Sequence, residues 1–209
     1  MNPPRVVDAG LESAPLRLRD GRDARALRVV VGMTGASGAT YGIDFLRRFP
    51  GEAHLVVSRW AKMVIHTETG LSEKDLEELA HGVHPDHDLS SPFASGSIRH
   101  DGCLILPASA STVGRIAAGI GDTLITRMAQ VALKERMPLV LGLRETPLSS
   151  ITLEALHKLS LAGAIVFPLS PPFYGRPESI EALVGATTSK LLRLLGVEVP
   201  GGWREDELE

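Results

Sequence analysis

Short apolar runs alternate along the chain with segments that have the residue spacing of helices. There are five such runs, and they cover residues 27–33, 53–57, 102–106, 139–143 and 164–167. At least one helical segment separates each run from the next, and parallel strands need long crossover connections of this kind. The sequence therefore predicts an α/β fold with a doubly wound, mostly parallel sheet and helices on both faces.

The expected helices follow the same alternation. They cover residues 38–49, 59–67, a segment opened by the capping-box spacing Ser72-Glu-Lys-Asp75, a short stretch after Ser111, and residues 122–136, 152–161 and 178–195. Residues 81–97 are rich in Pro, Asp, Ser and Gly, so they are expected to form one long loop. Ligands of doubly wound folds bind beyond the carboxyl ends of the strands. The loops that begin near Met33, Ser58, Pro107, Arg144 and Pro168 are therefore the ones expected to carry function.

Length and composition indicate one globular domain. The 209 residues suffice for a single α/β core, which we place at residues 27–200, with a disordered extension at 1–26 and a tail at 201–209. A formal charge of −3 offers no basic field for nucleic acid, and no apolar run is long enough to span a bilayer. Cys103 is the only cysteine, so an internal disulfide is excluded and a cytoplasmic location fits.

A glycine-rich turn, Gly32-Met-Thr-Gly-Ala-Ser-Gly38, follows the first expected strand. Its glycines are three residues apart, which is not the Gly-x-Gly-x-x-Gly spacing of dinucleotide sites. Thr34 and Ser37 add hydroxyls to free amides at a helix N-terminus, and such a terminus attracts anions. The turn is therefore interpreted as a cradle for the phosphate of a nucleotide-type cofactor, with FMN preferred. The alternative is a tight turn without a ligand.

The ends of the second and third strands narrow the choice of ligand. The second strand ends in Val57-Ser58-Arg59, without the acidic residue that holds the ribose of NAD, and the chain has no Walker sequence. The third is followed by Pro107-Ala-Ser-Ala-Ser-Thr112, whose hydroxyls and amides can serve a second part of the cofactor. Simple N-capping by Ser111 or Thr112 is the alternative for this segment.

Cationic side chains suggest a second anion site. Arg127 and Lys134 are seven residues apart in one expected helix and so project from the same face. Arg144 and Glu145 follow a strand within the expected crevice, where a charge pair is either desolvated or used in chemistry. After the last strand, Tyr174 adds a hydroxyl, Arg176 a guanidinium and Lys190 an ammonium group. We interpret these groups as one rim that binds a second phosphate; the alternative is a solvated surface.

Two further groups of titratable residues each have a functional and a structural interpretation. Glu68 follows the helix after Ser58 and can form a proton relay with Ser37, although a surface carboxylate is the simpler interpretation. The loop sequence His84-Pro-Asp-His87-Asp88 contains metal-binding residue types without rigid spacing. We therefore expect no metal.

Taken together, these motifs resemble the UbiX-type flavin prenyltransferases, a family long labelled aromatic acid decarboxylases. The resemblance extends over about residues 28–199 and is most specific at the Arg-Glu-Thr-Pro-Leu motif. The matching segments are Gly32-Met-Thr-Gly-Ala-Ser-Gly-Ala-Thr-Tyr-Gly42, His54-Leu-Val-Val-Ser58, Glu68-Thr69, Thr126-Arg127, Leu133-Lys-Glu-Arg136, Pro138-Leu-Val-Leu141, Arg144-Glu-Thr-Pro-Leu148 and Phe173-Tyr-Gly-Arg-Pro177.

The resemblance implies a Rossmann-like, flavodoxin-type subunit that assembles into a homododecamer with sites between subunits. It also implies a metal-independent reaction in which reduced FMN and dimethylallyl phosphate give prenylated FMN and phosphate. New bonds at N5 and C6 of the flavin close a fourth ring. The product then serves UbiD-type decarboxylases, including the one of ubiquinone biosynthesis.

Site residues carry over by position. The family binds FMN where this chain has Gly35, Ala36, Ser37, Ser58, Ser109, Ala110, Ser111, Thr112 and Arg144, and binds dimethylallyl phosphate where it has Tyr174 and Lys190. Fixed cations at the phosphate stabilise the charge that develops as the allylic carbon–oxygen bond breaks. The expected catalytic residues are Ser37, Glu68, Arg127, Lys134 and Glu145.

Two departures from the family pattern concern cations. Many members have Cys-Ser-x-Lys-Thr where this chain has Ala108-Ser-Ala-Ser-Thr112, so a cation near the flavin is lost. Lys190 stands where Arg is common, which replaces a bidentate fork by a point charge.

Two other functions remain as alternatives. The FMN-dependent cysteine decarboxylases have a similar fold, but their Asn-rich motif after the third strand is absent here. A non-catalytic flavin carrier would bind FMN without chemistry on allylic phosphates.

Overall fold

The computed structural model describes residues 17–18, 20–21 and 23–199. Within this part the strands form one parallel sheet with the order β3-β2-β1-β4-β5-β6. Their bounds are Arg28–Met33 for β1, Glu52–Val57 for β2, Gly82–Pro85 for β3, Gly102–Ala108 for β4, Leu139–Leu143 for β5 and Ile165–Pro168 for β6.

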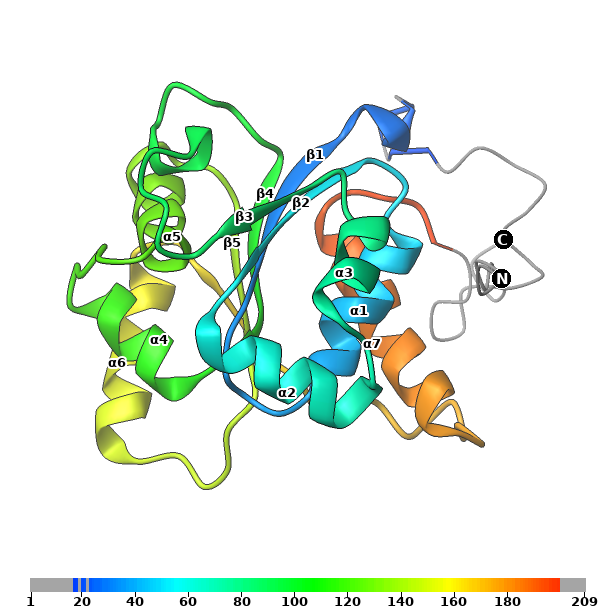
Figure 1. The fold of residues 1–209 in the computed structure, drawn as a ribbon. Coiled ribbons are helices and arrows are strands. Elements are labelled where there is room, and N and C mark those ends of the chain that lie inside the picture. Colours follow the sequence, from blue (N-terminus) through cyan, green and yellow to red (C-terminus); the bar gives the residue numbers. More distant parts are fainter. Residues whose placement is uncertain (1–16, 19, 22, 200–209) are drawn as a thin grey trace.

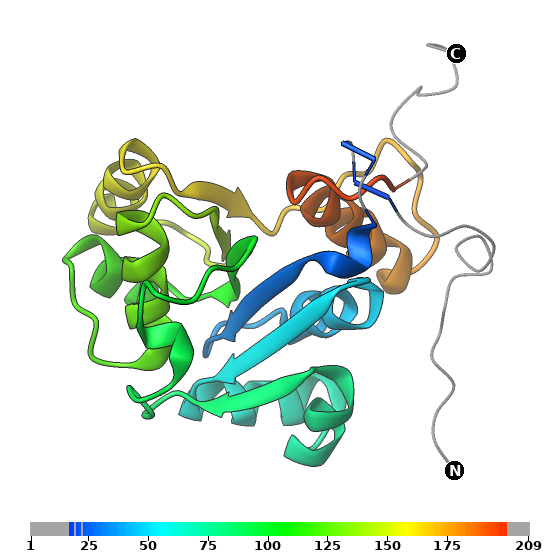
Figure 2. The same ribbon diagram turned by 90° about the horizontal axis from the view of Figure 1, so that it is seen from above.

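Helices cover both faces of this sheet (Figures 1 and 2). On one face lie α1 (Ala39–Arg48), α2 (Arg59–Thr69), α3 (Glu73–Leu79) and α7 (Ile180–Leu194), and on the other α4 (Ala110–Ala117), α5 (Leu124–Lys134) and α6 (Ser150–Leu161). Each face has its own buried apolar cluster. The predicted doubly wound α/β fold is therefore confirmed.

The central strands show why the sequence pattern was informative. All seven residues of β4 are buried, as are the last five of β1, because helices exclude water from both sides. Strands buried on both faces read as continuous apolar runs rather than as an alternation of apolar and polar residues.

The prediction of a single loop at residues 81–97 was wrong. This segment contains the sixth strand, β3, and a short 3-10 helix, η2 (Pro92–Ala94). β3 pairs with β2 at the edge of the sheet, and its four residues alternate between partly buried and exposed. An edge strand of this length needs no apolar run, and the pairing with β2 supplies its backbone hydrogen bonds.

The body of the domain begins before residue 27. Leu18 and Ala24 are buried, and Leu18 forms an isolated bridge with Val197. Most of the expected extension, residues 1–16, 19 and 22, and the expected tail at 201–209 lie outside the described residues. Among the described helices, none has the length and apolar character needed to cross a bilayer.

A pair of histidines joins β2 to β3. Nδ1 of His54 lies 3.3 Å from Nε2 of His84, and the Ser91 hydroxyl lies 3.4 Å from Nδ1 of His84. Phe93 packs against both imidazole rings. Burial lowers the pKa of both imidazoles, and the proximity of His84 lowers the pKa of His54 further. The carboxylates of Glu52 and Asp88 act in the opposite direction with smaller effect.

This pair predicts a loss of stability in mild acid. The unfolded chain takes up protons near the ordinary histidine pKa of 6.5, whereas the folded chain resists them to lower pH, so the free energy of unfolding falls as the pH drops below that value. Urea denaturation at about pH 7.5 and about pH 5.5 should show the decrease. A His54→Gln/His84→Gln variant should lose much of it, and His157→Gln, at an exposed site on α6, should not. Equal pH dependence in all three proteins would contradict the assignment.

Candidate functional site

The crevice of this fold lies where β1 and β4 end side by side. The two strands are neighbours in the sheet, but β1 leads into α1 on one face and β4 leads into α4 on the other. Ligands of doubly wound folds bind at such a switch point. The glycine turn and the Ser109–Thr112 segment therefore follow neighbouring strand ends, and the space beyond them is called the crevice here.

Thr34 joins the two strand ends. Its buried hydroxyl donates to the carbonyl oxygen of Pro107 at 2.8 Å and accepts from the N–H of Ser109 at 2.8 Å. The interpretation of this hydroxyl as an anion ligand was therefore wrong, since both hydrogen bonds are internal. Thr34 instead holds the turn after β1 against the turn after β4.

Glu68 occupies the N-terminus of α1. Its Oε2 accepts from the N–H groups of Gly38 and Ala39, each at 2.9 Å. Gly38 has a φ of 98°, a conformation that favours glycine, and this aims both N–H groups at the carboxylate. The chain's own anion thus takes the place that the sequence suggested for a phosphate. Ser37 lies directly before Gly38, but no hydrogen bond joins it to Glu68.

Three of the other backbone N–H groups of the turn form no hydrogen bond within the described part of the protein. Among the described residues, the backbone N–H groups of Gly35, Ala36 and Ser37 have no hydrogen-bond partner, and the Ser37 side chain is exposed. A run of N–H groups without internal partners can bind oxygen or ring-nitrogen acceptors of a ligand. This part of the turn can therefore donate hydrogen bonds to a ligand, whereas the first N–H groups of α1 already donate to Glu68.

Ser58 and Ser109 are N-caps. The Ser58 hydroxyl accepts from Ala61 N–H at 3.2 Å, and the Ser109 hydroxyl accepts from Thr112 N–H at 3.4 Å. The Ser109 hydroxyl also lies 3.2 Å from that of Ser111 and 3.0 Å from that of Thr112. The cap of α4 is therefore Ser109, not Ser111 or Thr112 as considered from the sequence. Ala110 follows as the first residue of α4.

Arg144 reaches across the crevice from β5. Its N–H donates to the carbonyl of Ala108 at 3.2 Å, and its Cγ lies 3.7 Å from the position of a Cβ on Gly38. The guanidinium forms no ion pair with a described residue, including Glu145, whose Oε1 accepts from Thr146 N–H at 3.0 Å. Arg144 and Glu145 therefore do not form a desolvated pair, one of the two alternatives for them, and both side chains are exposed.

Arg127 and Lys134 share one exposed face of α5, as predicted, but only the start of that helix is near the crevice. Leu124 N–H donates to the carbonyl of Asp86, just after β3, and Lys134 lies about 15 Å further along the helix. Arg127 donates to the carbonyl of Ala94 at 3.1 Å, and Lys134 pairs with Glu135. One chain therefore does not bring Lys134 to Arg144.

Lys190 is also remote from the glycine turn. Its neighbour Ser189 accepts a hydrogen bond from Arg48, the last residue of α1, at 3.0 Å. Lys190 thus lies at the opposite end of α1 from Gly38. Tyr174 is exposed in the segment after β6. The prediction that all these groups form one rim does not hold within a single chain.

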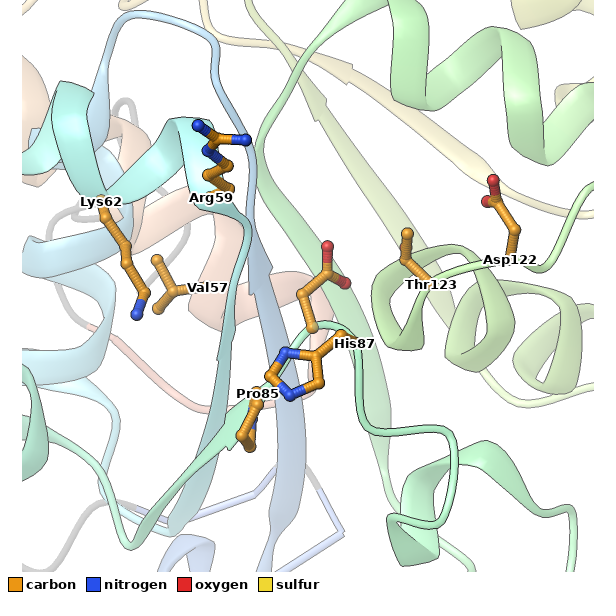
Figure 3. A pocket seen from close by; sticks show the side chains of 8 residues that line it. Val57, Arg59, Lys62, Pro85, His87, Asp122 and Thr123 are labelled. Atoms are coloured by element: carbon orange, nitrogen blue, oxygen red, sulfur yellow. The ribbon is translucent and has the colours of Figure 1, made fainter.

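A pocket of about 330 Å³ opens beside the crevice, at the ends of β2 and β3 (Figure 3). Arg59 and Lys62 form one wall, and Asp122 and Thr123 lie opposite. Sequence reasoning missed this pocket because it assigned β3, whose end forms part of the lining, to a loop. The only signal was the polar run His84 to Asp88.

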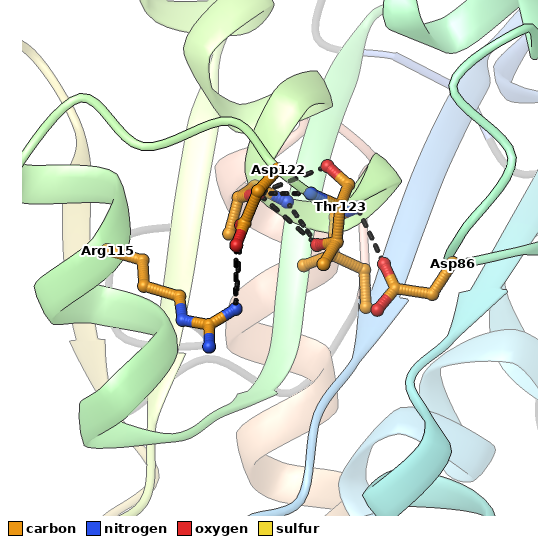
Figure 4. A network of polar contacts seen from close by, with 6 residues as sticks. Asp86, Arg115, Asp122 and Thr123 are labelled. Atoms are coloured by element: carbon orange, nitrogen blue, oxygen red, sulfur yellow. Dashed lines mark hydrogen bonds and ion pairs between the residues drawn. The ribbon is translucent and has the colours of Figure 1, made fainter.

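Both carboxylates of this pocket already form a hydrogen bond or an ion pair within the protein (Figure 4). Oδ1 of Asp86 accepts from Ile125 N–H at 3.0 Å, which fixes the start of α5 against the end of β3. Asp122 pairs with Arg115 at 3.3 Å. Arg59, on the opposite wall, forms no ion pair with a described residue and so leaves a positive charge at the pocket. Its guanidinium lies 5.4 Å from the centre of the Trp60 ring.

Comparison with known proteins defines the class first. The chain matches the Flavoprotein family over residues 17–192, nearly the whole described part. It is 47% identical over 185 residues to the flavin prenyltransferase UbiX of Deinococcus radiodurans, covering 86% of this chain and 95% of that protein. The chain belongs to the UbiX-type flavin prenyltransferase family.

Solved structures agree with this assignment. AnUbiX (PadA1), determined in complex with FMN and dimethylallyl pyrophosphate, has a TM-score of 0.81 and 42% identity, covering 86% of this chain and all of that one. A dodecameric FMN-dependent UbiX-like decarboxylase from Escherichia coli O157:H7 also has a TM-score of 0.81, with 40% identity, covering 85% of this chain and 98% of that one. The flavodoxin-type fold implied by the resemblance is thereby confirmed.

The contact between Glu68 and α1 predicts a measurable contribution to stability. Replacing Glu68 by Ala removes the acceptor of two N-terminal N–H groups, and lost caps of this kind cost about 1–2 kcal/mol. Urea denaturation of the ligand-free protein should show the decrease. Glu77→Ala, at an exposed position of α3, is the matched control. Equal stabilities of the two variants would refute the capping role.

Proposed function

We propose that this protein is a flavin prenyltransferase that transfers the dimethylallyl group of dimethylallyl phosphate to reduced FMN. One observation carries the proposal: the crevice between β1 and β4 presents uncommitted donors from Gly35 to Ser37 and from Arg144. This donor set fits a ligand that is both heteroaromatic and anionic. The proposal is also supported by the 42% identity of this chain to AnUbiX (PadA1), which was solved with FMN and dimethylallyl pyrophosphate.

Residues that follow four strands, β1, β2, β4 and β5, hold the flavin in this proposal. They are Gly35, Ala36, Ser37, Ser58, Ser109, Ala110, Ser111, Thr112 and Arg144. Reduced FMN supplies the nucleophilic N5 and C6 atoms to which the prenyl group is attached. The protein's part is to orient the reactants and exclude water, which turns a bimolecular encounter into a nearly intramolecular step.

Cations activate the departing phosphate. When the allylic carbon–oxygen bond breaks, its electron pair leaves with the phosphate, and Arg127, Lys134, Arg144 and Lys190 stabilise the charge that develops there. Lys134 and Lys190 lie far from Arg144 in one chain. We therefore propose that the phosphate site is assembled from several subunits of a homo-oligomer, which we infer to be a dodecamer.

Protons are moved by Ser37 and Glu68. Glu68 is held at the N-terminus of α1, next to Ser37, so a proton released during ring closure has an acceptor within one residue of the flavin site. Glu145 and Tyr174 hydrogen-bond the phosphate and protonate it as it leaves. Each of these roles is part of the proposal.

The product is prenylated FMN, and we propose that a UbiD-type decarboxylase receives it, in ubiquinone biosynthesis or a related pathway. We place the enzyme in the cytoplasm, which is supported by a single buried cysteine whose thiol pKa is raised by burial. The cysteine-decarboxylase alternative is not favoured, because Pro107 to Thr112 contains no Asn.

Prenyl transfer itself can be tested by mass spectrometry. Anaerobic incubation with reduced FMN and dimethylallyl phosphate, with the diphosphate in parallel, should increase the flavin mass by one prenyl unit without added metal. A flavin that binds tightly but keeps its mass with several allylic phosphates would instead indicate a non-catalytic carrier.

Lys134 provides a test of the shared site. Lys134→Ala should lower kcat about 100- to 1,000-fold while leaving FMN affinity unchanged, because a fixed cation at the developing charge is lost. Lys158→Ala, at an exposed position of α6, is the matched control. Oligomers mixed from Lys134→Ala and Ser37→Ala subunits should regain activity that neither parent has. Failure of the mixed oligomers would place both residues in the same subunit's site.

A further inference from the structure

Trp60 lies at the start of α2 with its side chain against the glycine turn. A Cβ atom on Gly35 would lie 2.7 Å from the Trp60 Cβ and 3.7 Å from its Cγ. Such a contact is too short for two carbon atoms, so residue 35 has to be glycine for Trp60 to occupy this position. The packing joins Trp60 directly to the segment whose N–H groups are uncommitted.

The indole itself is largely uncovered. The relative exposure of Trp60 is 61%, whereas Phe45, Phe49 and Phe93 are buried in the core. Its position is held from one side, because the Arg59 guanidinium lies over the ring, 5.4 Å from the centroid. The exposed part of the ring remains accessible to a partner. An exposed aromatic face beside a row of hydrogen-bond donors is complementary to a flat heteroaromatic ring with polar edges.

We propose that the indole of Trp60 contacts the isoalloxazine ring of bound FMN and forms one wall of the flavin site. This inference rests on the proposed function, because it needs FMN at the Gly35–Ser37 turn. Trp60 makes and breaks no bond in the reaction. It buries one side of the flavin and limits the orientations in which the ring can lie.

Flavin fluorescence provides the test, because an indole in contact with an excited isoalloxazine donates an electron to it and quenches its emission before the electron returns. The chain has two tryptophans, Trp60 and Trp203. A Trp203→Leu protein therefore carries Trp60 alone, and a Trp60→Leu/Trp203→Leu protein carries neither. Comparing the two isolates the effect of Trp60.

The lifetime of bound oxidised FMN should be several-fold longer in the double variant than in the single one. FMN affinity should fall about two- to tenfold, the range expected for loss of one aromatic contact. Equal lifetimes in the two proteins would overturn the inference while leaving the proposed function intact. Absence of FMN binding to the wild-type protein would overturn both.

A second measurement covers the case in which the double variant does not fold. In the Trp203→Leu protein, FMN should protect Trp60 from quenching by acrylamide at a constant oligomeric mass, measured by sedimentation. Protection that is already complete in the FMN-free oligomer would show that a neighbouring subunit covers the indole, and it would overturn the inference.

Discussion

The hydroxyl of Thr34 joins the ends of the two central strands, and the geometry of the site depends on this contact. It donates to Pro107 at the end of β4 and accepts from Ser109 at the start of α4. The backbone N–H of Thr34 also donates to the Pro107 carbonyl, at 3.2 Å. Because β1 and β4 continue onto opposite faces of the sheet, these contacts of Thr34 fix the separation of the two loops that flank the crevice.

The chain satisfies several of its helix N-termini with its own groups. Ser58 and Ser109 cap α2 and α4, and Glu68 caps α1 from another helix. The site is therefore not a general phosphate cradle at a helix terminus. The N–H groups without an internal partner in the described part of the chain lie just before the helix, at Gly35 to Ser37. The same arrangement places the Glu68 carboxylate beside Ser37.

The separation of the cations limits what one chain can offer to a single phosphate. Arg144 lies at the strand ends, but Lys134 is at the far end of α5 and Lys190 is beside the far end of α1. A phosphate cannot contact all three in one subunit. A closed oligomer brings different ends of the same subunit together at each interface, so repeated copies of one chain can complete repeated sites.

The sequence by itself determined the order of the buried strands, the doubly wound architecture and the family, because strands covered on both faces are continuous apolar runs and the loop motifs are specific. It failed at β3, whose edge pairing depends on β2 rather than on its own residues. Only the tertiary structure decided that Thr34 is internal, that Glu68 occupies the α1 terminus and that Lys134 and Lys190 are remote from Arg144. These are contacts between segments up to about a hundred residues apart, such as Thr34 and Ser109, and local spacing carries no information about them. The glycine turn illustrates both: its sequence indicated a strand-end loop of functional interest, but only the contact with Glu68 showed which N–H groups at the end of that turn are already hydrogen-bonded.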